Sequence, residues 1–293
     1  MTKTAWVFPG QGSQAVGMGM DLLDLPIAQE RFTEASEILG WSVIDRCQGD
    51  EATLSQTLYT QPCLYTIETI LADLLNQAGQ KPDYVAGHSL GEYSALYAAG
   101  VFTFTAGLKL IQRRATLMDS ASDGMMAALL GADRTALLAA IAQTEGAVLA
   151  NDNNDGQVVI SGTPTAVETI MTQVKAKRAV KLNVSGAFHS PLMAAAATEF
   201  NQMLSEVTFN DAQVPVLSNV DPNPATTGEV LKERLRLQMT GSVRWREISS
   251  GLMEVAVERI VEVGPGKVLL GIMKRTCTGV TLEAVGTRQD LNL

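Results

Sequence analysis

One short segment constrains this chain more than any other feature. The run Gly87-His88-Ser89-Leu90-Gly91 lies between the apolar residues 84–86 and a helical stretch from about 92 to 99. A Gly-x-Ser-x-Gly pattern in that setting is typical of a sharp strand-to-helix turn that exposes a serine at its tip. Glycines flank the serine because such a turn leaves no room for side chains. The segment predicts an α/β fold with Ser89 as a nucleophile, although so short a pattern also arises by chance.

Strand-like runs alternate with helical periodicity through most of the chain. Apolar residues recur at helical spacing over 64–78, and Pro82-Asp83 then leads into the apolar run 84–86. The first apolar run, 5–8, is too short for a signal peptide and indicates a buried strand. This alternation predicts a mainly parallel sheet that is covered by helices.

The pattern changes between about residues 123 and 184. Residues 126–131, 157–162 and 180–184 resemble strands, and helical stretches begin near Asp133 and Pro164. The polar run 151–156 predicts a turn between strands. We therefore expect a small α+β subdomain over 123–187, inserted into a large domain formed by 1–122 and 188–293.

A serine nucleophile needs a general base, and the chain has only two histidines. His88 is adjacent to Ser89, and neighbouring side chains on an extended segment point to opposite sides. His189 is left as the candidate. It precedes Ser190-Pro191, an N-cap and first residue for a helix over 192–204, whose positive end favours a neutral imidazole. The alternative is a loop histidine without a role.

Arg114 is the most discriminating residue. Helical periodicity over 105–121 places Arg114 in the middle of an apolar arc and Arg113 on the outer side. A guanidinium in an apolar face requires an anion, which is either a buried structural partner or the carboxylate of a substrate. Arginine suits the second task because its planar fork binds a carboxylate through two hydrogen bonds. A serine acyl-enzyme with an arginine that binds a substrate carboxylate suggests that the substrate is the monothioester of a dicarboxylic acid, such as a malonyl thioester.

Two glycine-rich loops allow other interpretations. The run 10–15 matches the relaxed dinucleotide fingerprint, but the acidic residue at the end of a second strand is missing, because residues 27–39 look helical. We interpret this loop as a set of backbone donors near the site. The run 264–267 resembles a phosphate loop only superficially, and we expect a turn after a strand at 260–263.

Charge and cysteine content exclude several classes of protein. With 22 Lys and Arg against 31 Asp and Glu, the net charge of −9 argues against binding to nucleic acid. Three widely spaced cysteines without metal-ligand spacing indicate reduced thiols in a cytoplasmic protein and no metal site. No apolar run is long enough to span a membrane.

The basic cluster Lys175, Lys177, Arg178 and Lys181 is either solvated surface or a docking site for an acidic carrier protein.

The motifs, and the order in which they follow one another along the chain, resemble those of the malonyl-CoA:acyl carrier protein transacylases. The acyltransferase domains of polyketide synthases are wider relatives of that family. The resemblance extends over essentially the whole chain. It is carried by Phe8 to Gln14, Gln61-Pro62, Gly87 to Ala95, Arg114, Gln157 to Gly162, Ala187 to Ser190 and Glu262 to Lys267.

The resemblance implies a role for each matching residue. Ser89 would be the nucleophile, His189 its base, and Arg114 the partner of the malonyl carboxylate. The backbone N–H groups of Gln11 and Leu90 would form the oxyanion hole.

Two further residues are implied by the resemblance alone. The main-chain carbonyl of Gln238 would orient the histidine in place of an acid, and Phe188 matches the malonyl-selecting form of its motif. The family fold is a large α/β-hydrolase-like domain with a ferredoxin-like insert.

The implied activity is transfer of malonyl from malonyl-CoA to the phosphopantetheine thiol of acyl carrier protein, for fatty acid synthesis. The coenzyme A thioester is a substrate, and no cofactor is required. Two alternatives remain: a serine esterase or thioesterase, and a non-catalytic scaffold that binds the carrier. We expect a monomer.

Overall fold

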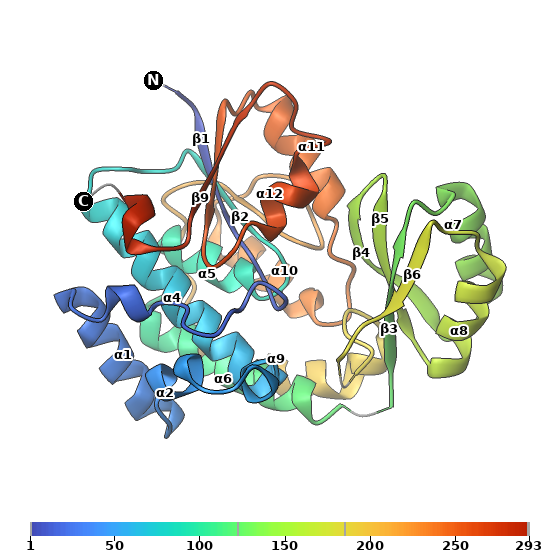
Figure 1. Ribbon diagram of the computed structural model, residues 1–293, viewed down its shortest axis with the longest axis horizontal. Helices are drawn as coiled ribbons and strands as arrows, with labels where there is room; N and C mark the ends of the chain where they lie inside the picture. The colour runs from blue at the N-terminus through green and yellow to red at the C-terminus, as the bar shows by residue number, and fades with distance from the viewer. Residues whose placement is uncertain (1, 122, 185, 292–293) are drawn as a thin grey trace.

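Two sheets organise the chain into a larger and a smaller unit (Figure 1). The structure is a computed structural model, and it describes residues 2–121, 123–184 and 186–291. The boundaries expected for the inserted subdomain, after residues 122 and 187, remain predictions. Ser122 lies outside the described residues.

The sheet of the larger unit is parallel throughout. Its strand order is β7-β2-β1-β8-β9, and each neighbouring pair is parallel. The strands are β1 (Thr4–Phe8), β2 (Tyr84–Gly87), β7 (Val216–Leu217), β8 (Arg259–Val263) and β9 (Thr281–Val285). The predicted α/β fold with a mainly parallel sheet is confirmed.

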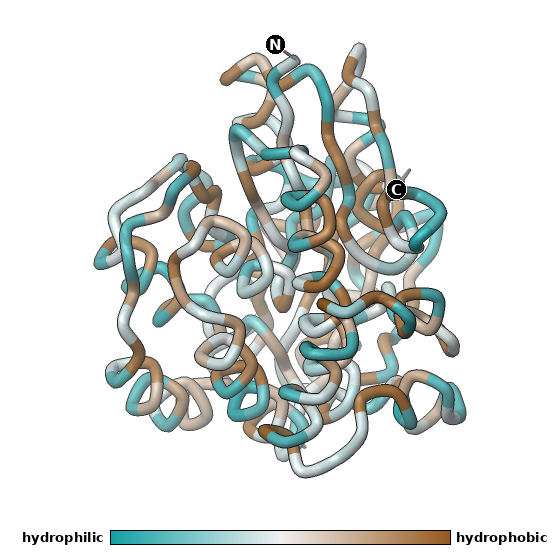
Figure 2. Tube along the Cα trace, turned by 90° about the vertical axis from the view of Figure 1, so that its left-hand side faces the viewer, coloured by the Kyte–Doolittle hydropathy of each residue, from teal (hydrophilic) through white to brown (hydrophobic). Residues whose placement is uncertain are grey.

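Helices cover both faces of this sheet because its central strand is apolar on both sides. Trp6 and Phe8 of β1 pack into one core cluster, whereas Ala5 and Val7 pack into another. Figure 2 shows the brown, hydrophobic segments concentrated along the inner strands and helices. The first face carries α1 (Pro26–Leu39), α2 (Val43–Gln48), α3 (Glu51–Leu54), α4 (Thr57–Gln77), α5 (Gly91–Ala98), α6 (Phe104–Asp119), α9 (Ala194–Glu206) and α10 (Gly228–Gln238); the second carries α11 (Trp245–Glu254) and α12 (Val268–Met273).

The smaller unit has the element order βαββαβ, and its antiparallel sheet has the order β4-β5-β3-β6. This is the ferredoxin-like α+β arrangement that was predicted. The elements are β3 (Met125–Leu130), α7 (Arg134–Gln143), β4 (Ala147–Asn154), β5 (Gln157–Gly162), α8 (Pro164–Gln173) and β6 (Arg178–Lys181).

Two local predictions in this unit were only partly right. The turn predicted over 151–156 is confined to Asp155 and Gly156, whereas residues 151–154 form the end of β4. Tertiary pairing overrides their turn propensity, because the backbone N–H of Asp152 donates to the carbonyl of Val243 at 2.9 Å. The strand expected at 180–184 is β6, which ends at Lys181. Leu182 and Val184 line a cavity beside Ser89 instead.

Candidate active site

Ser89 lies at the tip of the turn between β2 and α5. Its backbone has a left-handed φ of 53°, which is strained for a non-glycine residue and is often found at functional sites. The flanking glycines are required by sterics: a Cβ on Gly87 would lie 1.9 Å from the carbonyl of Gly91, and one on Gly91 would lie 2.1 Å from the Phe8 oxygen. The chain therefore presents the hydroxyl where β1 and β2 end.

Asn219, which the sequence analysis missed, holds this turn in place. It follows the short strand β7, and its side chain is fully buried. Its Oδ1 accepts a hydrogen bond from the Ser89 N–H at 2.7 Å, and its Nδ2 donates to the Gly87 oxygen at 2.6 Å. The available signal was the polar pair Ser218-Asn219 after the strand, because functional residues gather at the carboxyl ends of parallel strands.

His189 lies beside the serine. The Ser89 Oγ is 2.7 Å from His189 Nε2, and His189 Nδ1 is 3.0 Å from the Gln238 carbonyl and 3.1 Å from the Gly241 carbonyl. Because both carbonyls can only accept, the ring proton is assigned to Nδ1. Nε2 is then free to accept the proton of the serine hydroxyl.

The imidazole is held in its neutral form. His189 is 4% exposed, and burial lowers its pKa to about 3, with the positive charge of Arg114 as the second cause. The helix that was expected to start at residue 192 begins as a 3-10 turn, Pro191–Met193, before α9. Burial and the neighbouring guanidinium, more than a helix end, therefore keep the base unprotonated.

Arg114 reaches the serine from α6. Its side chain is 1% exposed, and its Nη2 donates to Ser89 Oγ at 2.9 Å while its Nη1 donates to Gln61 Oε1 at 2.8 Å. Across the described ranges, no carboxylate forms a salt bridge with this guanidinium, and its Nε has no hydrogen-bond partner. Burial lowers the pKa of Arg114, but an arginine stays charged at neutral pH. The structural ion pair considered for Arg114 is thus not found.

The side chain of Gln238 connects these groups, a role that the sequence analysis did not assign. Its Oε1 accepts from Arg114 Nη2 at 3.2 Å. Its Nε2 donates to the Ser89 carbonyl at 2.8 Å and to the buried carboxylate of Glu92 at 2.7 Å. Gln238 therefore positions the guanidinium through its side chain and contacts the imidazole through its main chain.

A cavity of about 100 Å³ opens beside the Ser89 hydroxyl. Its lining brings together all the residues selected from the sequence except Gln238, which packs behind it. These are Gln11, Ser89, Leu90, Arg114, Phe188 and His189, and other lining residues include Gln61, Met118, Met126 and Asn151. In the part of the chain that is described, the backbone N–H groups of Gln11 and Leu90 have no hydrogen-bond acceptor. Free donors of this kind can stabilise a developing oxyanion.

These contacts define what the site can do chemically. A hydroxyl, a neutral imidazole that can take its proton, and unpaired N–H groups together support attack on an acyl carbonyl. A buried cation beside the hydroxyl favours an acyl group that carries its own negative charge. Within residues 2–121, 123–184 and 186–291 there is no cluster of His, Cys, Asp and Glu that could hold a metal ion, and no helix long and apolar enough to cross a membrane.

Comparison with known proteins agrees with this geometry. Residues 5–290 match the family model of the acyl transferase domain. The malonyl CoA-acyl carrier protein transacylase of Synechocystis is 61% identical over 99% of both chains, and that of Escherichia coli K12 is 41% identical over 97% of this chain and 96% of its own.

Solved structures give the same result. The crystal structure of the Synechocystis malonyl-CoA:ACP transacylase superposes with a TM-score of 0.98, covers 99% of both chains and shares 61% of the sequence. A malonyl-transacylase in complex with its type II polyketide acyl-carrier protein superposes with a TM-score of 0.93 at 36% identity, over 99% of this chain and 98% of its own. These relatives confirm the resemblance that was drawn from the motifs. The chain belongs to the acyl transferase domain family.

Proposed function

We infer that this protein transfers a malonyl group from malonyl-CoA to the phosphopantetheine thiol of acyl carrier protein, and so supplies malonyl units for fatty acid synthesis. Its relatives over the full length bear the name of this activity. The group would be carried as an ester on Ser89.

One observation carries the choice of substrate. The guanidinium of Arg114 is buried, lies 2.9 Å from the Ser89 hydroxyl, and forms no direct salt bridge among the described residues; the carboxylate of Glu92 is linked to it only through Gln238. A buried guanidinium without a direct salt bridge is costly unless an anion neutralises it. A malonyl group brings a carboxylate that is separated from the reacting carbonyl by one methylene, so both ends can lie between Ser89 and Arg114.

The reaction then proceeds in two halves. His189 takes the proton of Ser89 as Oγ attacks the thioester carbonyl, and the oxyanion accepts hydrogen bonds from the N–H groups of Gln11 and Leu90. As the tetrahedral intermediate collapses, His189 gives this proton to the sulfur of coenzyme A, which leaves as the thiol. In the second half the carrier thiol gives its proton to His189 and attacks the malonyl ester. Collapse of the tetrahedral intermediate releases Ser89, which regains its proton from His189.

Intact-mass measurement tests this function directly. The protein is mixed with malonyl-CoA and, separately, with acetyl-CoA and a longer neutral acyl-CoA. We expect a mass increase of one malonyl group, which disappears when holo acyl carrier protein is added and reappears on the carrier. No mass increase would support the non-catalytic scaffold, and loss of malonyl to water rather than to the carrier would support the esterase.

The geometry of His189 argues against the esterase. In the described chain its Nδ1 meets two carbonyl oxygens and no carboxylate. Serine hydrolases instead orient this nitrogen with an Asp or Glu. A carboxylate-binding arginine within the cavity also has no use in a general esterase.

The low pKa of His189 predicts an unusual pH profile. An ordinary histidine base would lose activity below a pH of about 6.5. Because burial and Arg114 lower the pKa of His189 to about 3, the imidazole stays neutral over this range. We expect kcat/KM for acyl-enzyme formation from malonyl-CoA to stay within about twofold between roughly pH 5 and pH 8. Stopped-flow release of coenzyme A measures it, with circular dichroism confirming that the protein stays folded.

The contribution of Arg114 to the low pKa of His189 can be measured separately from that of burial. Removing its positive charge in Arg114→Ala makes the imidazolium less unfavourable, so the pKa of His189 should rise. With acetyl-CoA as the substrate, the acid limb of the variant should therefore lie at higher pH than that of the wild type. A wild-type pH–activity profile with its acid midpoint near 6.5 would contradict the prediction that the pKa of His189 is lowered.

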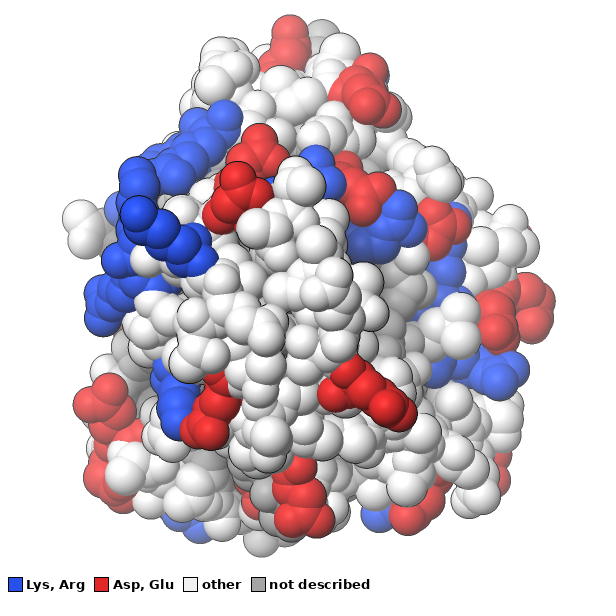
Figure 3. Space-filling view, turned by 90° about the vertical axis from the view of Figure 1, so that its right-hand side faces the viewer, with Lys and Arg blue, Asp and Glu red and all other residues white. Residues whose placement is uncertain are grey.

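The basic cluster is the surface that we propose for docking of the carrier. Lys175, Lys177, Arg178 and Lys181 are all exposed, and on the face of the molecule in Figure 3 the blue side chains gather in a band along the left-hand edge. Lys177 packs against Gly131, where an added Cβ would lie 2.8 Å from its side chain. An excess of positive charge on a chain of net charge −9 would steer an acidic carrier to this side.

Charge reversal tests this docking surface. The double variant Lys177→Glu and Arg178→Glu should raise KM for the carrier about tenfold or more, because attraction becomes repulsion, while acyl-enzyme formation from malonyl-CoA should be unchanged. Reversal of Lys81 and Lys109, which are exposed on the other unit, is the matched control. An unchanged KM at low salt would remove this surface from the proposal.

Two predictions from the sequence extend this proposal. We propose that the protein works as a monomer, which sedimentation velocity would check, and that it acts in the cytoplasm, where its three buried free cysteines would stay reduced.

A further inference from the structure

We propose that Asp152 is a positioning residue for malonyl transfer: it fastens the edge strand of the smaller unit to the larger unit beside the catalytic pair. The inference rests on the proposed function, because its effect is measured on that reaction. Nothing in the motifs that identify the family points to this residue.

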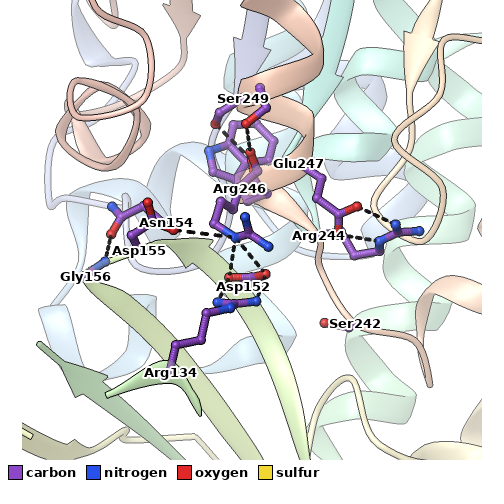
Figure 4. A network of polar contacts seen from close by, with 12 residues as sticks. Arg134, Asp152, Asn154, Asp155, Gly156, Ser242, Arg244, Arg246, Glu247 and Ser249 are labelled. Carbon is purple, nitrogen blue, oxygen red and sulfur yellow. Dashed lines mark hydrogen bonds and ion pairs between the residues drawn. The ribbon is translucent and has the colours of Figure 1, made fainter. Parts of the chain in front are cut away.

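Asp152 forms an ion-pair cluster with one arginine from each unit. It is 3% exposed, and Arg134, at the start of α7, donates to its two oxygens at 2.8 and 2.6 Å. Arg246 of α11 donates through Nε to the same oxygens at 3.4 and 3.2 Å. Figure 4 shows the carboxylate between the two guanidinium groups. The pair with Arg246 thus bridges the smaller and the larger unit.

The strand that carries Asp152 also carries two residues of the site. Asn151 lines the cavity beside Ser89. Asn153 Oδ1 lies 2.9 Å from Nε2 of His88, the residue before the nucleophile. Consecutive residues can contact the larger unit because the pairing of β4 with β5 shifts between Leu149 and Asn151 and again between Asp152 and Asn154, and such bulges redirect side chains.

His88 transmits the position of this strand to the turn of Ser89. Its ring lies between Asn153 of the smaller unit and Trp245 of α11. The centroids of the His88 and Trp245 rings are 5.4 Å apart, in an edge-on contact. Burial lowers the pKa of His88, so the neutral ring donates through Nε2 to the Asn153 oxygen. A shift of β4 would therefore move the group next to the nucleophile.

The same strand also contacts the segment that orients His189. Gly241 supplies one of the two carbonyls that face His189 Nδ1. Two residues further on, Val243 donates to the Ala150 carbonyl at 2.8 Å and accepts from the Asp152 N–H at 2.9 Å. Both Ser89 and His189 thus have a neighbour whose position depends on β4. Within β4, Asp152 forms the ion pair that crosses the junction, by which we mean the contact between the smaller and the larger unit.

Neutralising Asp152 should release this junction. Asp152→Asn keeps the shape of the side chain but removes the buried charge between Arg134 and Arg246, and leaves the exposed Asp155, 3.9 Å from Arg246 Nε, as the nearest salt-bridge partner. The weakened attraction favours separation of the two arginines. We expect kcat for malonyl transfer to fall about tenfold or more while KM for malonyl-CoA changes less than about threefold. We also expect more of the malonyl-enzyme to be hydrolysed, because a loosened junction admits water.

Two further variants keep the test decisive if Asp152→Asn folds poorly. Arg246→Gln removes the partner in the larger unit at a partly exposed position and should reproduce the loss of kcat, whereas Arg246→Lys retains the cation and should restore most of it. Glu283→Gln is the control, because it breaks another arginine–carboxylate pair, with Arg259 at 2.6 Å, at the far edge of the large sheet. It should leave kcat and hydrolysis unchanged.

The outcomes separate this proposal from the proposed function. Wild-type protein that forms no malonyl-enzyme would contradict the function itself. If the wild type transfers malonyl and folded Asp152→Asn and Arg246→Gln keep kcat within about twofold, Asp152 has no positioning role. Equal losses in Arg246→Gln and Arg246→Lys would also overturn it, since the cation would then be irrelevant.

Discussion

Ser89→Ala should gain no malonyl mass and should transfer no malonyl to the carrier. The hydroxyl contacts both the imidazole, at 2.7 Å, and the guanidinium, at 2.9 Å, and Ser89 is the one serine among the described residues that line the cavity. Removing the nucleophile of a serine enzyme lowers kcat by roughly 10⁶-fold. We expect a loss of that size.

The fold should survive this substitution, because the turn is held by the backbone. The Ser89 N–H donates to Asn219 whatever the side chain is. Thermal unfolding of the variant should therefore match the wild type within a few degrees. Ser205→Ala, at an exposed position of α9, is the control that should keep full activity. A malonyl adduct on folded Ser89→Ala would place the nucleophile elsewhere.

Arg114→Ala should reverse the preference of the enzyme among acyl groups. Without the guanidinium the malonyl carboxylate would be buried without a partner, and truncating a buried charge pair of this kind costs about 2–5 kcal/mol. We expect kcat/KM for malonyl-CoA to fall about 10²- to 10³-fold. Acetyl-CoA carries no carboxylate, so its transfer should be kept or increased.

The neighbouring arginine provides a matched control. Arg113 lies on the outer side of α6 and pairs with Glu199 at 2.6 Å on the surface, where such pairs contribute little. Arg113→Ala should therefore behave as the wild type with both substrates. An equal loss of malonyl and acetyl transfer in Arg114→Ala would indicate that this arginine supports the fold of the site and does not bind the substrate.

Prediction from the sequence was successful where local signals agree with the tertiary structure. The strand-turn-helix around Ser89 has a strong local cause, because glycine is the only residue that fits on either side of the serine. Helical periodicity placed Arg114 on the buried face of α6, and there it is 1% exposed. The parallel sheet, the ferredoxin-like insert and the family are confirmed, whereas the catalytic roles of the individual residues stay predictions.

Prediction failed where distant segments override local propensity. The run 151–154 has the composition of a turn, yet it forms the end of β4 because residues 150 and 152 pair with Val243. Asn219 and the side chain of Gln238 were missed for a related reason: their hydrogen bonds reach residues 130 and 149 positions away. No periodicity within a segment can report such partners.

The amino-acid sequence determined the class of fold, the family and the residue types available for the chemistry, because glycine sterics and apolar periodicity act over a few neighbouring positions. The tertiary structure alone decided how those residues are used. It left the guanidinium of Arg114 without a carboxylate, lowered the pKa of His189 by burial, and set Asp152 between arginines from two units. These properties depend on desolvation and on contacts across the fold, which arise only when segments far apart in the chain come together.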